Sequence, residues 1–353
     1  MAGGIGSRFW PLSTADRPKQ FIDILGIGKT LLQLTFERFN RIIPAENFFV
    51  VTSERYKEVV MEQLPLLNES QLLLEPLRRN TAPCIAYATH KIASICPTAK
   101  IVVSPSDHLI LKEDLFLNEI EKGLQFAEEN NVLVTLGIQP SRPETGYGYI
   151  QVSEKLKYNH FDNLFKVKTF TEKPDRAMAQ VFVDTGEFYW NSGIFVWSAP
   201  SIQDAFQKYL PDLDMLFDIG KKLINTSDER SFINKTYSEC PNISIDYGIM
   251  EKADNVYVLT ADFGWSDLGT WGSLYENHPL DKSGNAVSGS KTFLYDTKGC
   301  IVNLPEEKTA VIQGLQDYII VESQNTLLIC KKEEEQQIRQ FVADVMLSKE
   351  RKI

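Results

Sequence analysis

A glycine-rich segment near the start of the chain, AGGIGSRFWPLSTADRPKQF, has the composition of a phosphate-binding loop. Gly3, Gly4 and Gly6 have no Cβ, so their backbone N–H groups can approach a triphosphate closely. Arg8 and Lys19 add positive charge to a chain whose net charge is −10. The glycines alone are more typical of a turn, but with these two cations they favour a phosphate ligand. The segment lacks both the GKS or GKT sequence of a Walker A loop and the third glycine of a dinucleotide fingerprint.

Asp107 is a candidate ligand for a metal ion. It follows a predicted buried strand at 100–104, and open α/β sheets bind ligands at the carboxyl ends of their strands. Mg²⁺ prefers carboxylates beside phosphate oxygens and water, so one or two Asp residues suffice. The alternatives are an Asx turn or a helix cap, which are commoner for an isolated Asp in a loop. His108 can orient Asp107, although a lone His is more often structural.

The sequence GGIGSRFWPLS, followed by PKQF, closely resembles the signature of the sugar-nucleotidyltransferase family, in its mannose-1-phosphate guanylyltransferase branch. The resemblance extends from residue 1 to about residue 276. It implies that the glycine loop, including Ser7, binds the phosphates of a nucleotide. It also implies that Arg8 and Lys19 stabilise charge as pyrophosphate leaves. Phosphoryl-type transfer depends mostly on positioning and on cations at the transferring and leaving oxygens, so these residue types suit the chemistry.

The same resemblance implies that Asp107 and Asp267 hold Mg²⁺ as the cofactor. Asp267 lies in the sequence FGWSDLGTW, where the residues alone favour a helix N-cap. The family uses the matching position as its second metal ligand, so we expect the same role here.

The loop EPLRRNTAP connects a predicted strand to a predicted helix and offers groups that can recognise a nucleobase. Guanine presents N1–H and N2–H₂ donors, which a carboxylate such as Glu75 can accept. Asn80 or Thr81 is also expected to cap the following helix. The pattern resembles the loop of guanylyl rather than thymidylyl or uridylyl members of the family, and therefore predicts GTP as the nucleotide.

Three later segments offer groups for a sugar phosphate. GYGY offers backbone donors beside aromatic rings, EKP a carboxylate and an ammonium, and WNSG an amide. Each segment by itself is more typical of a hairpin, a strand end or a turn, but their order and spacing resemble the family's sugar-binding segments. The predicted sugar-phosphate residues are Tyr147, Gly148, Glu172, Lys173, Asn191 and Gly193.

The predicted reaction is guanylyl transfer from GTP to α-D-mannose 1-phosphate, giving GDP-mannose and pyrophosphate by Mg²⁺-assisted in-line attack. One alternative is a glucose-1-phosphate thymidylyl- or uridylyltransferase, against which the RNTAP sequence argues. Another is a non-catalytic regulatory protein that binds nucleotide sugars. Such a protein could lose Lys19, Asp107 or Asp267 and keep its fold, but all three are present.

The pattern of elements predicts an α/β fold with a doubly wound, mixed and mainly parallel sheet, similar to a Rossmann fold. Thr30 and Gln33 form a predicted capping box. We expect a catalytic domain at 1–283 and a β-rich, β-helix-like domain at 284–353 that ends in a helix. The expected strands are 47–52, 71–75, 100–104, 132–136, 148–152, 164–172 and 190–197, and the expected helices are 54–64, 82–96, 113–129, 175–184, 200–209, 228–238 and 333–346.

The acidic composition argues against nucleic acid or an anionic membrane as a partner, because either would need an excess of Lys and Arg on some face. The 5 cysteines are scattered without CxxC spacing, which favours a reducing cytoplasm over a disulfide framework. No apolar run suggests a membrane span or a signal peptide.

A homodimer through 327–330 is a further expectation, based on an apolar strand. The glycine loop begins at Gly3, so we expect that Met1 lies inside the first strand and that the natural start is upstream. The resembling branch includes forms with an appended cupin isomerase, for which this chain leaves no length.

Overall fold

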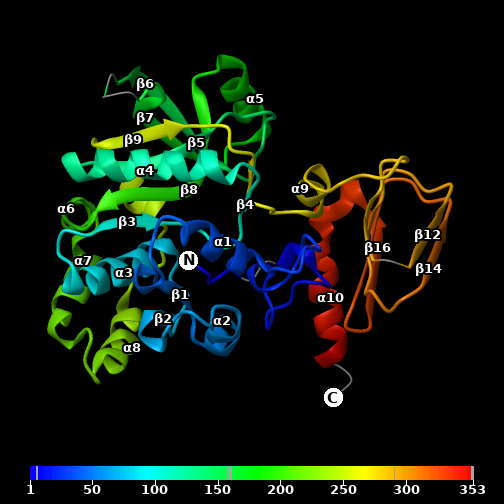
Figure 1. Ribbon diagram of the computed structural model, residues 1–353, viewed down its shortest axis with the longest axis horizontal. Coiled ribbons are helices and arrows are strands. Elements are labelled where there is room, and N and C mark those ends of the chain that lie inside the picture. The colour runs from blue at the N-terminus through cyan, green and yellow to red at the C-terminus, as the bar shows by residue number, and fades with distance from the viewer. Residues whose placement is uncertain (5–6, 157, 159–160, 290, 351–353) are drawn as a thin grey trace. The chain divides into compact units, whose positions relative to one another are not determined.

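The computed structural model describes residues 1–4, 7–156, 158, 161–289 and 291–350, so Gly6 lies outside the described residues (Figure 1). The chain forms two compact units whose segments alternate along the sequence. The first unit contains Met1–Gly3, Arg38–Pro105 and Ile110–Trp265. The second contains Gly4–Glu37, Ser106–Leu109 and Ser266–Ile353. The predicted boundary at 283/284 stays a proposal.

The first unit is built on a six-stranded sheet with the order β3-β8-β5-β9-β7-β6. The sheet is mixed, as predicted, but the expectation of mainly parallel pairing is wrong. Only β5 and β9 pair in parallel among its described neighbours, and the other described pairs are antiparallel. A separate parallel pair is formed by β1 and β2. The strands are β1 Val50–Ser53, β2 Leu72–Glu75, β3 Lys100–Val103, β5 Leu133–Ile138, β6 Gly148–Lys155, β7 Leu164–Glu172, β8 Phe188–Ser198 and β9 Val256–Thr260.

Helices cover both faces of this sheet because its central strands are apolar on both faces. In β8, Phe195 and Trp197 belong to one core, and Ile194 and Val196 to the other, as the two-residue period of a strand requires. Residues of α3, α6, α7 and α8 complete the first core, and residues of α4 and α5 the second. The α-helices are α2 Lys57–Gln63, α3 Thr81–Ile95, α4 Glu113–Glu129, α5 Arg176–Thr185, α6 Ala199–Tyr209, α7 Pro211–Asp218 and α8 Glu229–Glu239.

The first residues of the chain bond to β1 and to the residue after β3. The Met1 ammonium donates to the Ser104 carbonyl at 2.9 Å, and the Ala2 N–H donates to the Val51 carbonyl at 2.8 Å. The Thr52 hydroxyl donates to the Ala2 carbonyl at 3.0 Å. These bonds bring Gly3 close to Glu75 at the end of β2, where an added Cβ would lie 3.4 Å from Glu75 Oε2.

The second unit begins at Gly4, inside the glycine loop, and contains the predicted β-helical tail. Strands β11, β13 and β15 stack in parallel, β12 and β14 form a second parallel pair, and β16 closes the first stack by pairing antiparallel with β15. This stacking confirms the β-helix-like expectation. The elements are α9 Trp271–Glu276, β11 Ala286–Ser288, β12 Thr292–Tyr295, β13 Ile301–Asn303, β14 Ala310–Gln313, β15 Tyr318–Ser323, β16 Thr326–Lys331 and α10 Ile338–Glu350.

The helices and strands predicted from local sequence patterns agree closely with the observed elements of the first unit. Helix 113–129 and strand 164–172 are confirmed at both ends, and the other predicted elements of the first unit differ from the observed ones by a few residues. The helix after Thr30 is α1 Leu31–Phe39, and both bonds of its capping box are present at 3.3 and 3.0 Å. The short strands β4 Leu109–Ile110 and β10 Trp265–Ser266 each contain one of the boundaries between the units. Among the described helices, none is long and apolar enough to cross a membrane.

Candidate active site

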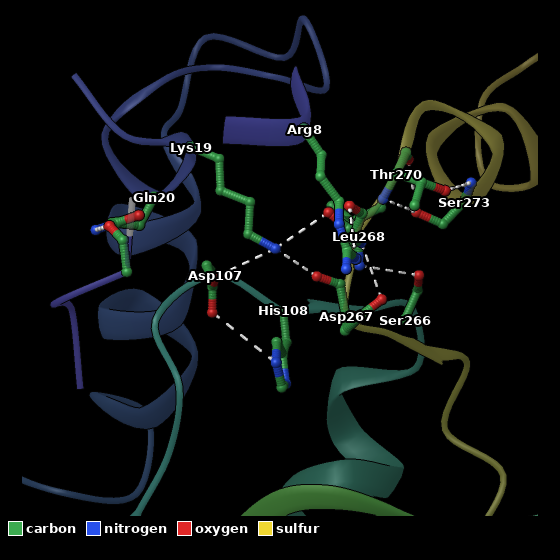
Figure 2. Close-up of polar contacts among 12 residues, drawn as sticks. Arg8, Lys19, Gln20, Asp107, His108, Ser266, Asp267, Leu268, Thr270 and Ser273 are labelled. Atoms are coloured by element: carbon green, nitrogen blue, oxygen red, sulfur yellow. Dashed lines mark hydrogen bonds and ion pairs between the residues drawn. The ribbon is translucent and has the colours of Figure 1, made fainter. Parts of the chain in front are cut away.

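The Lys19 side chain is the centre of a polar cluster in the second unit (Figure 2). Its Nζ lies 3.1 Å from Asp107 Oδ2 and donates to the backbone carbonyls of Asp267 at 2.5 Å and Leu268 at 3.1 Å. Only 6% of Lys19 is exposed. A buried ammonium loses its hydration, so it needs oxygen atoms of the protein in place of water. The cluster therefore fixes Lys19 against both segments predicted to hold a metal.

Asp107 is the anionic member of this cluster. Its side chain is 26% exposed, and its second oxygen, Oδ1, lies 3.9 Å from His108 Nε2. Burial by itself raises the pKa of Asp107, but the Lys19 ammonium and the His108 ring outweigh it, so the pKa lies below its usual value. Asp107 is therefore a carboxylate at neutral pH, and the orienting role of His108 stays a prediction.

Asp267 lies at a tight turn that aims two carbonyls at Lys19. Leu268 has a φ of +43°, in the left-handed region that non-glycine residues rarely adopt. The turn is held by bonds from the Leu268 N–H to Ser266 Oγ at 3.2 Å and from the Gly269 N–H to Asp267 Oδ1 at 2.9 Å. Thr270, rather than Asp267, then caps α9 through its side chain. The N-cap interpretation of Asp267 is therefore wrong.

Arg8 and Gly4 of the glycine loop lie in the same unit as this turn, whereas Gly3 belongs to the first unit. Arg8 donates to the Gly269 carbonyl at 3.5 Å, so Arg8 and Lys19 contact consecutive residues of one segment (Figure 2). Gln20 Nε2 donates to the Gly4 carbonyl at 2.9 Å and holds the loop beside Lys19. Ser7 begins the short helix η1 Ser7–Phe9, directly before Arg8. Within the second unit the structure thus brings together Gly4 of the predicted phosphate loop and both predicted cations.

The donor chemistry of the cluster fits Mg²⁺. Asp107 and Asp267 supply carboxylate oxygens, the hard ligands that Mg²⁺ prefers. The described residues contain no group of three or more His, Cys, Asp or Glu side chains arranged to hold a metal. The pair Asp107 and Asp267 is compatible with an ion that takes one or two carboxylates and completes its shell with phosphate oxygens and water.

Glu75, in the first unit, ends β2 and is largely buried. Tyr237 of α8 donates to Glu75 Oε1 at 3.2 Å. Burial raises the pKa of Glu75 to about 7, although the Tyr237 hydrogen bond and the charges of the N-terminal ammonium and Arg78 oppose the shift. A ligand that donates N–H groups to this carboxyl would favour its ionised form.

Asn80 and Thr81 begin α3, as predicted. Asn80 has a φ of +68°, and its Oδ1 accepts from the Thr81 N–H at 2.9 Å, so Asn80 is the N-cap. Thr81 Oγ1 accepts from the Ile245 N–H at 2.9 Å. The capping role is therefore confirmed, and the role in nucleobase binding stays a prediction.

The three predicted sugar segments converge in the first unit. Gly148 and Glu172 are paired residues of β6 and β7, and a Cβ on Gly148 would clash with Glu172 Oε2 and lie 3.5 Å from Asn191 Cβ. A side chain at Gly148 would therefore displace the Glu172 carboxylate. Lys173 forms an ion pair with Glu172, and Gly193, with a φ of +68°, donates to Asn191 Oδ1 at 3.2 Å. Tyr147 packs edge-on against Trp190, next to Asn191 in the sequence, with ring centroids 5.1 Å apart.

Two residues that contact the predicted site residues were not found from the sequence. Tyr237 donates to Glu75, and Asp246 accepts from Asn191 Nδ2 at 2.8 Å. Tyr237 lies inside α8, where helical periodicity marks it as a core residue. Asp246 begins the short π-helical turn Asp246–Met250, and π-type turns occur often at functional sites. That turn is not visible in the periodicity of the sequence.

Comparison with known proteins identifies the family to which the chain is similar. Residues 1–284 match the family model "Nucleotidyl transferase", and residues 291–345 match "MannoseP isomerase/GMP-like beta-helix domain". A mannose-1-phosphate guanylyltransferase of Klebsiella pneumoniae is 36% identical over 348 residues, which are 97% of this chain and 72% of that protein. The alginate biosynthesis protein AlgA of Pseudomonas aeruginosa is 34% identical over 350 residues, 98% of this chain and 71% of that protein.

Solved structures show the same relationship. A crystal structure described as mannose-1-phosphate geranyltransferase from Thermus thermophilus is 30% identical, with a TM-score of 0.86 and 98% of both chains covered. One described as mannose-6-phosphate isomerase from Helicobacter pylori is 27% identical, with a TM-score of 0.60 over 71% of this chain and 95% of the other.

The chain therefore belongs to the nucleotidyl transferase family and is a nucleotidyltransferase enzyme. Its relatives within that family are mannose-1-phosphate guanylyltransferases, at about a third identity over nearly the whole chain. The family resemblance inferred from the glycine loop and the PKQF sequence is confirmed.

The raised pKa of Glu75 predicts a pH-dependent effect of Glu75→Gln on stability. The folded-state pKa of about 7 exceeds the usual 4.5, so ionising Glu75 lowers stability as the pH rises through this window. At pH 8 the unfolding free energy of the variant should be higher than that of the wild type by on the order of 2 kcal/mol. At pH 5 the difference should be less than half as large.

Urea unfolding at both pH values measures this effect. Glu62→Gln, at an exposed position of α2, is the control and should shift neither curve appreciably. An equal gain for Glu75→Gln at both pH values would contradict the burial of an ionisable group as the cause.

Proposed function

We propose that the protein transfers the guanylyl group of GTP to α-D-mannose 1-phosphate, giving GDP-mannose and pyrophosphate. The observation that carries the proposal is the Lys19 cluster, in which the predicted phosphate-loop cation contacts both predicted metal-binding segments. The relatives described as mannose-1-phosphate guanylyltransferases support the choice of substrates.

In this proposal Asp107 and Asp267 hold Mg²⁺. The ion would neutralise charge on the triphosphate oxygens when bound. Lys19 contacts the Asp107 carboxylate and the backbone carbonyl of Asp267, so its ammonium lies beside both residues assigned to the ion. Arg8 approaches the next carbonyl of the segment, at Gly269. We assign to Arg8 and Lys19 the role of stabilising the negative charge that grows on pyrophosphate as its bond to the α-phosphorus breaks.

The attacking group is an oxygen of the sugar phosphate, which is already anionic. It forms a bond to the α-phosphorus while the bond from that phosphorus to the bridging oxygen breaks in line, and pyrophosphate leaves with the electron pair. Neither a protein nucleophile nor a general base is required. Alignment of the two reactants can lower the barrier by roughly 7–11 kcal/mol.

The first unit supplies recognition in this proposal. Glu75 accepts from the guanine N1–H and N2–H₂ donors, beside Asn80 and Thr81 at the start of α3. Sugar hydroxyls and the phosphate are assigned to the cluster described above, Tyr147, Gly148, Glu172, Lys173, Asn191 and Gly193. A cytoplasmic location and a homodimer, both expected from the sequence, remain parts of this proposal.

A matrix of nucleoside triphosphates against sugar 1-phosphates, read as pyrophosphate release in the presence of Mg²⁺, tests the substrate assignment. GTP with mannose 1-phosphate should give the highest kcat/KM, because the carboxyl of Glu75 matches the donors of guanine. Highest activity with dTTP or UTP and glucose 1-phosphate would overturn the substrates but not the reaction class. Binding of GDP-mannose without turnover of any pair would favour a regulatory protein.

The metal assignment predicts that Asp107→Asn and Asp267→Asn each lower kcat by at least about a hundredfold at fixed Mg²⁺. Titration of Mn²⁺ by electron paramagnetic resonance, with GTP present, should show weaker binding in both variants. The exposed Asp262 offers a matched control, and Asp262→Asn should leave both measurements unchanged. Wild-type activity in either variant would remove that residue from the metal site.

The two variants should differ in thermal unfolding. Asp107→Asn removes the charged partner of a buried ammonium and should lower Tm, because Lys19 loses its ion pair. Asp267 holds Lys19 through its backbone carbonyl, which Asp267→Asn keeps, so its Tm should change less.

Lys19→Ala should lower kcat by roughly 10²–10³, equal to about 3–4 kcal/mol, with a much smaller rise in the KM for GTP. The reason is that a preorganised cation acts on charge that develops in the transition state. Steady-state kinetics over a GTP titration separates the two constants. Lys29→Ala, at an exposed ion pair with Glu37, is the control. A rise in KM alone would limit Lys19 to ground-state binding.

A further inference from the structure

The side-chain amide of Asn191 is held in one orientation by three partners within the first unit. Its Oδ1 accepts from the Thr135 hydroxyl and the Gly193 N–H, each at 3.2 Å. Its Nδ2 donates to Asp246 Oδ1 at 2.8 Å, the shortest of the three bonds. An amide group has one acceptor side and one donor side, and an ionised carboxylate can only accept. Asp246 therefore determines that the donor side of Asn191 faces it.

Asp246 is itself fixed by its backbone. The preceding residue, Ile245, donates its N–H to Thr81 Oγ1 at 2.9 Å, and the Ile243 carbonyl accepts from the Ala82 N–H at 3.1 Å. The segment before Asp246 is thus attached to the first turn of α3. Asp246 is the first residue of the π-helical turn that follows, so its side chain leaves the backbone directly after the segment that is hydrogen-bonded to α3.

A carboxylate at this position is unfavourable for stability. Burial, and after it the negative charge of Glu172, raise the pKa of Asp246 to about 6, although the hydrogen bond from Asn191 opposes the shift. Burial and the negative charges of Glu172 and Asp246 also raise the pKa of Glu251, so these three acidic side chains influence one another. Perturbed acids of this kind occur preferentially at functional sites.

The amide of Asn191 has donor capacity left for a ligand. Nδ2 carries two hydrogens, and no other hydrogen bond from it is formed within the described part of the chain. Glu172 and the Cβ-free backbone of Gly148 lie beside it. This is the group of residues to which the proposed function assigns the sugar phosphate.

We propose that Asp246 is a positioning residue for the sugar phosphate, which acts by orienting the Asn191 amide. The proposal rests on the proposed function, because it assumes that Asn191 donates to the sugar phosphate. Asp246 itself does not need to touch the substrate. Its removal should weaken sugar-phosphate binding through Asn191 and leave GTP binding unchanged.

A double-mutant cycle of Asp246→Ala and Asn191→Ala tests this role at pH 8, where Asp246 is ionised in the wild type. Asp246→Ala should raise the KM for mannose 1-phosphate about tenfold, the effect of losing one charge-assisted hydrogen bond, with kcat and the KM for GTP within about twofold. Asn191→Ala should have at least this effect. The double variant should be no worse than Asn191→Ala, because Asp246 acts through Asn191.

Two further variants separate positioning from a general structural role. Asp246→Asn keeps a side-chain oxygen that can accept from Asn191, so its KM for mannose 1-phosphate should return to within about threefold of the wild type. Glu251→Gln changes a neighbouring acid that does not bond to Asn191, and should leave this KM unchanged. If Asp246→Ala does not fold, Asp246→Ser replaces it in the same cycle, because the shorter hydroxyl side chain cannot reach Asn191.

Additive effects in the cycle would overturn the proposal, because Asp246 would then act independently of Asn191. An unchanged KM for mannose 1-phosphate in Asp246→Ala would overturn it as well, as would equal rises in the KM of both substrates. Failure of the proposed function would appear differently. The wild type would then release no pyrophosphate from GTP and mannose 1-phosphate, and the cycle would be measured with the sugar phosphate that the activity matrix identifies.

Discussion

The buried ammonium of Lys19 imposes the strongest constraint on the second unit. A cation removed from water must be surrounded by oxygen atoms, and here they come from Asp107 and from the carbonyls of Asp267 and Leu268. The turn at Leu268 must keep its left-handed backbone conformation to present both carbonyls. The requirement to bury one charge therefore fixes two distant segments around the same ammonium, and both carry the predicted metal ligands.

In the first unit, by contrast, the buried groups at the predicted binding residues are acids rather than an ammonium. Glu75 and Asp246 are acids whose pKa values are raised, mainly by burial, to about 7 and about 6. Asp107, with Lys19 beside it, has a lowered pKa. The first unit thus contains carboxyl groups that gain from hydrogen-bond donors of a neutral ligand, such as a base or a sugar. The second unit contains cations and an ionised carboxylate, which suit phosphates and a metal ion.

Hydrogen bonds from side chains or the backbone of distant segments connect the predicted ligand-binding residues to the scaffold. Thr81 accepts from Ile245, Asn191 donates to Asp246, and Tyr237 donates to Glu75. In each pair, one residue lies in a segment with a predicted binding role and the other comes from a distant helix or turn. Such partners fix the direction of a donor or acceptor, and direction determines which ligand group can bind.

The sequence by itself determined what depends on neighbours along the chain. The capping box at Thr30, the helical period of α4, the Cβ-free glycine loop and the family signature required no tertiary information. Only the tertiary structure decided that β5 pairs in parallel with β9 but antiparallel with β8, since pairing depends on strands far apart in the sequence. The partners Tyr237 and Asp246 were hidden for the same reason. Their hydrogen bonds join residues that only the folded chain brings together, and no spacing pattern records that proximity.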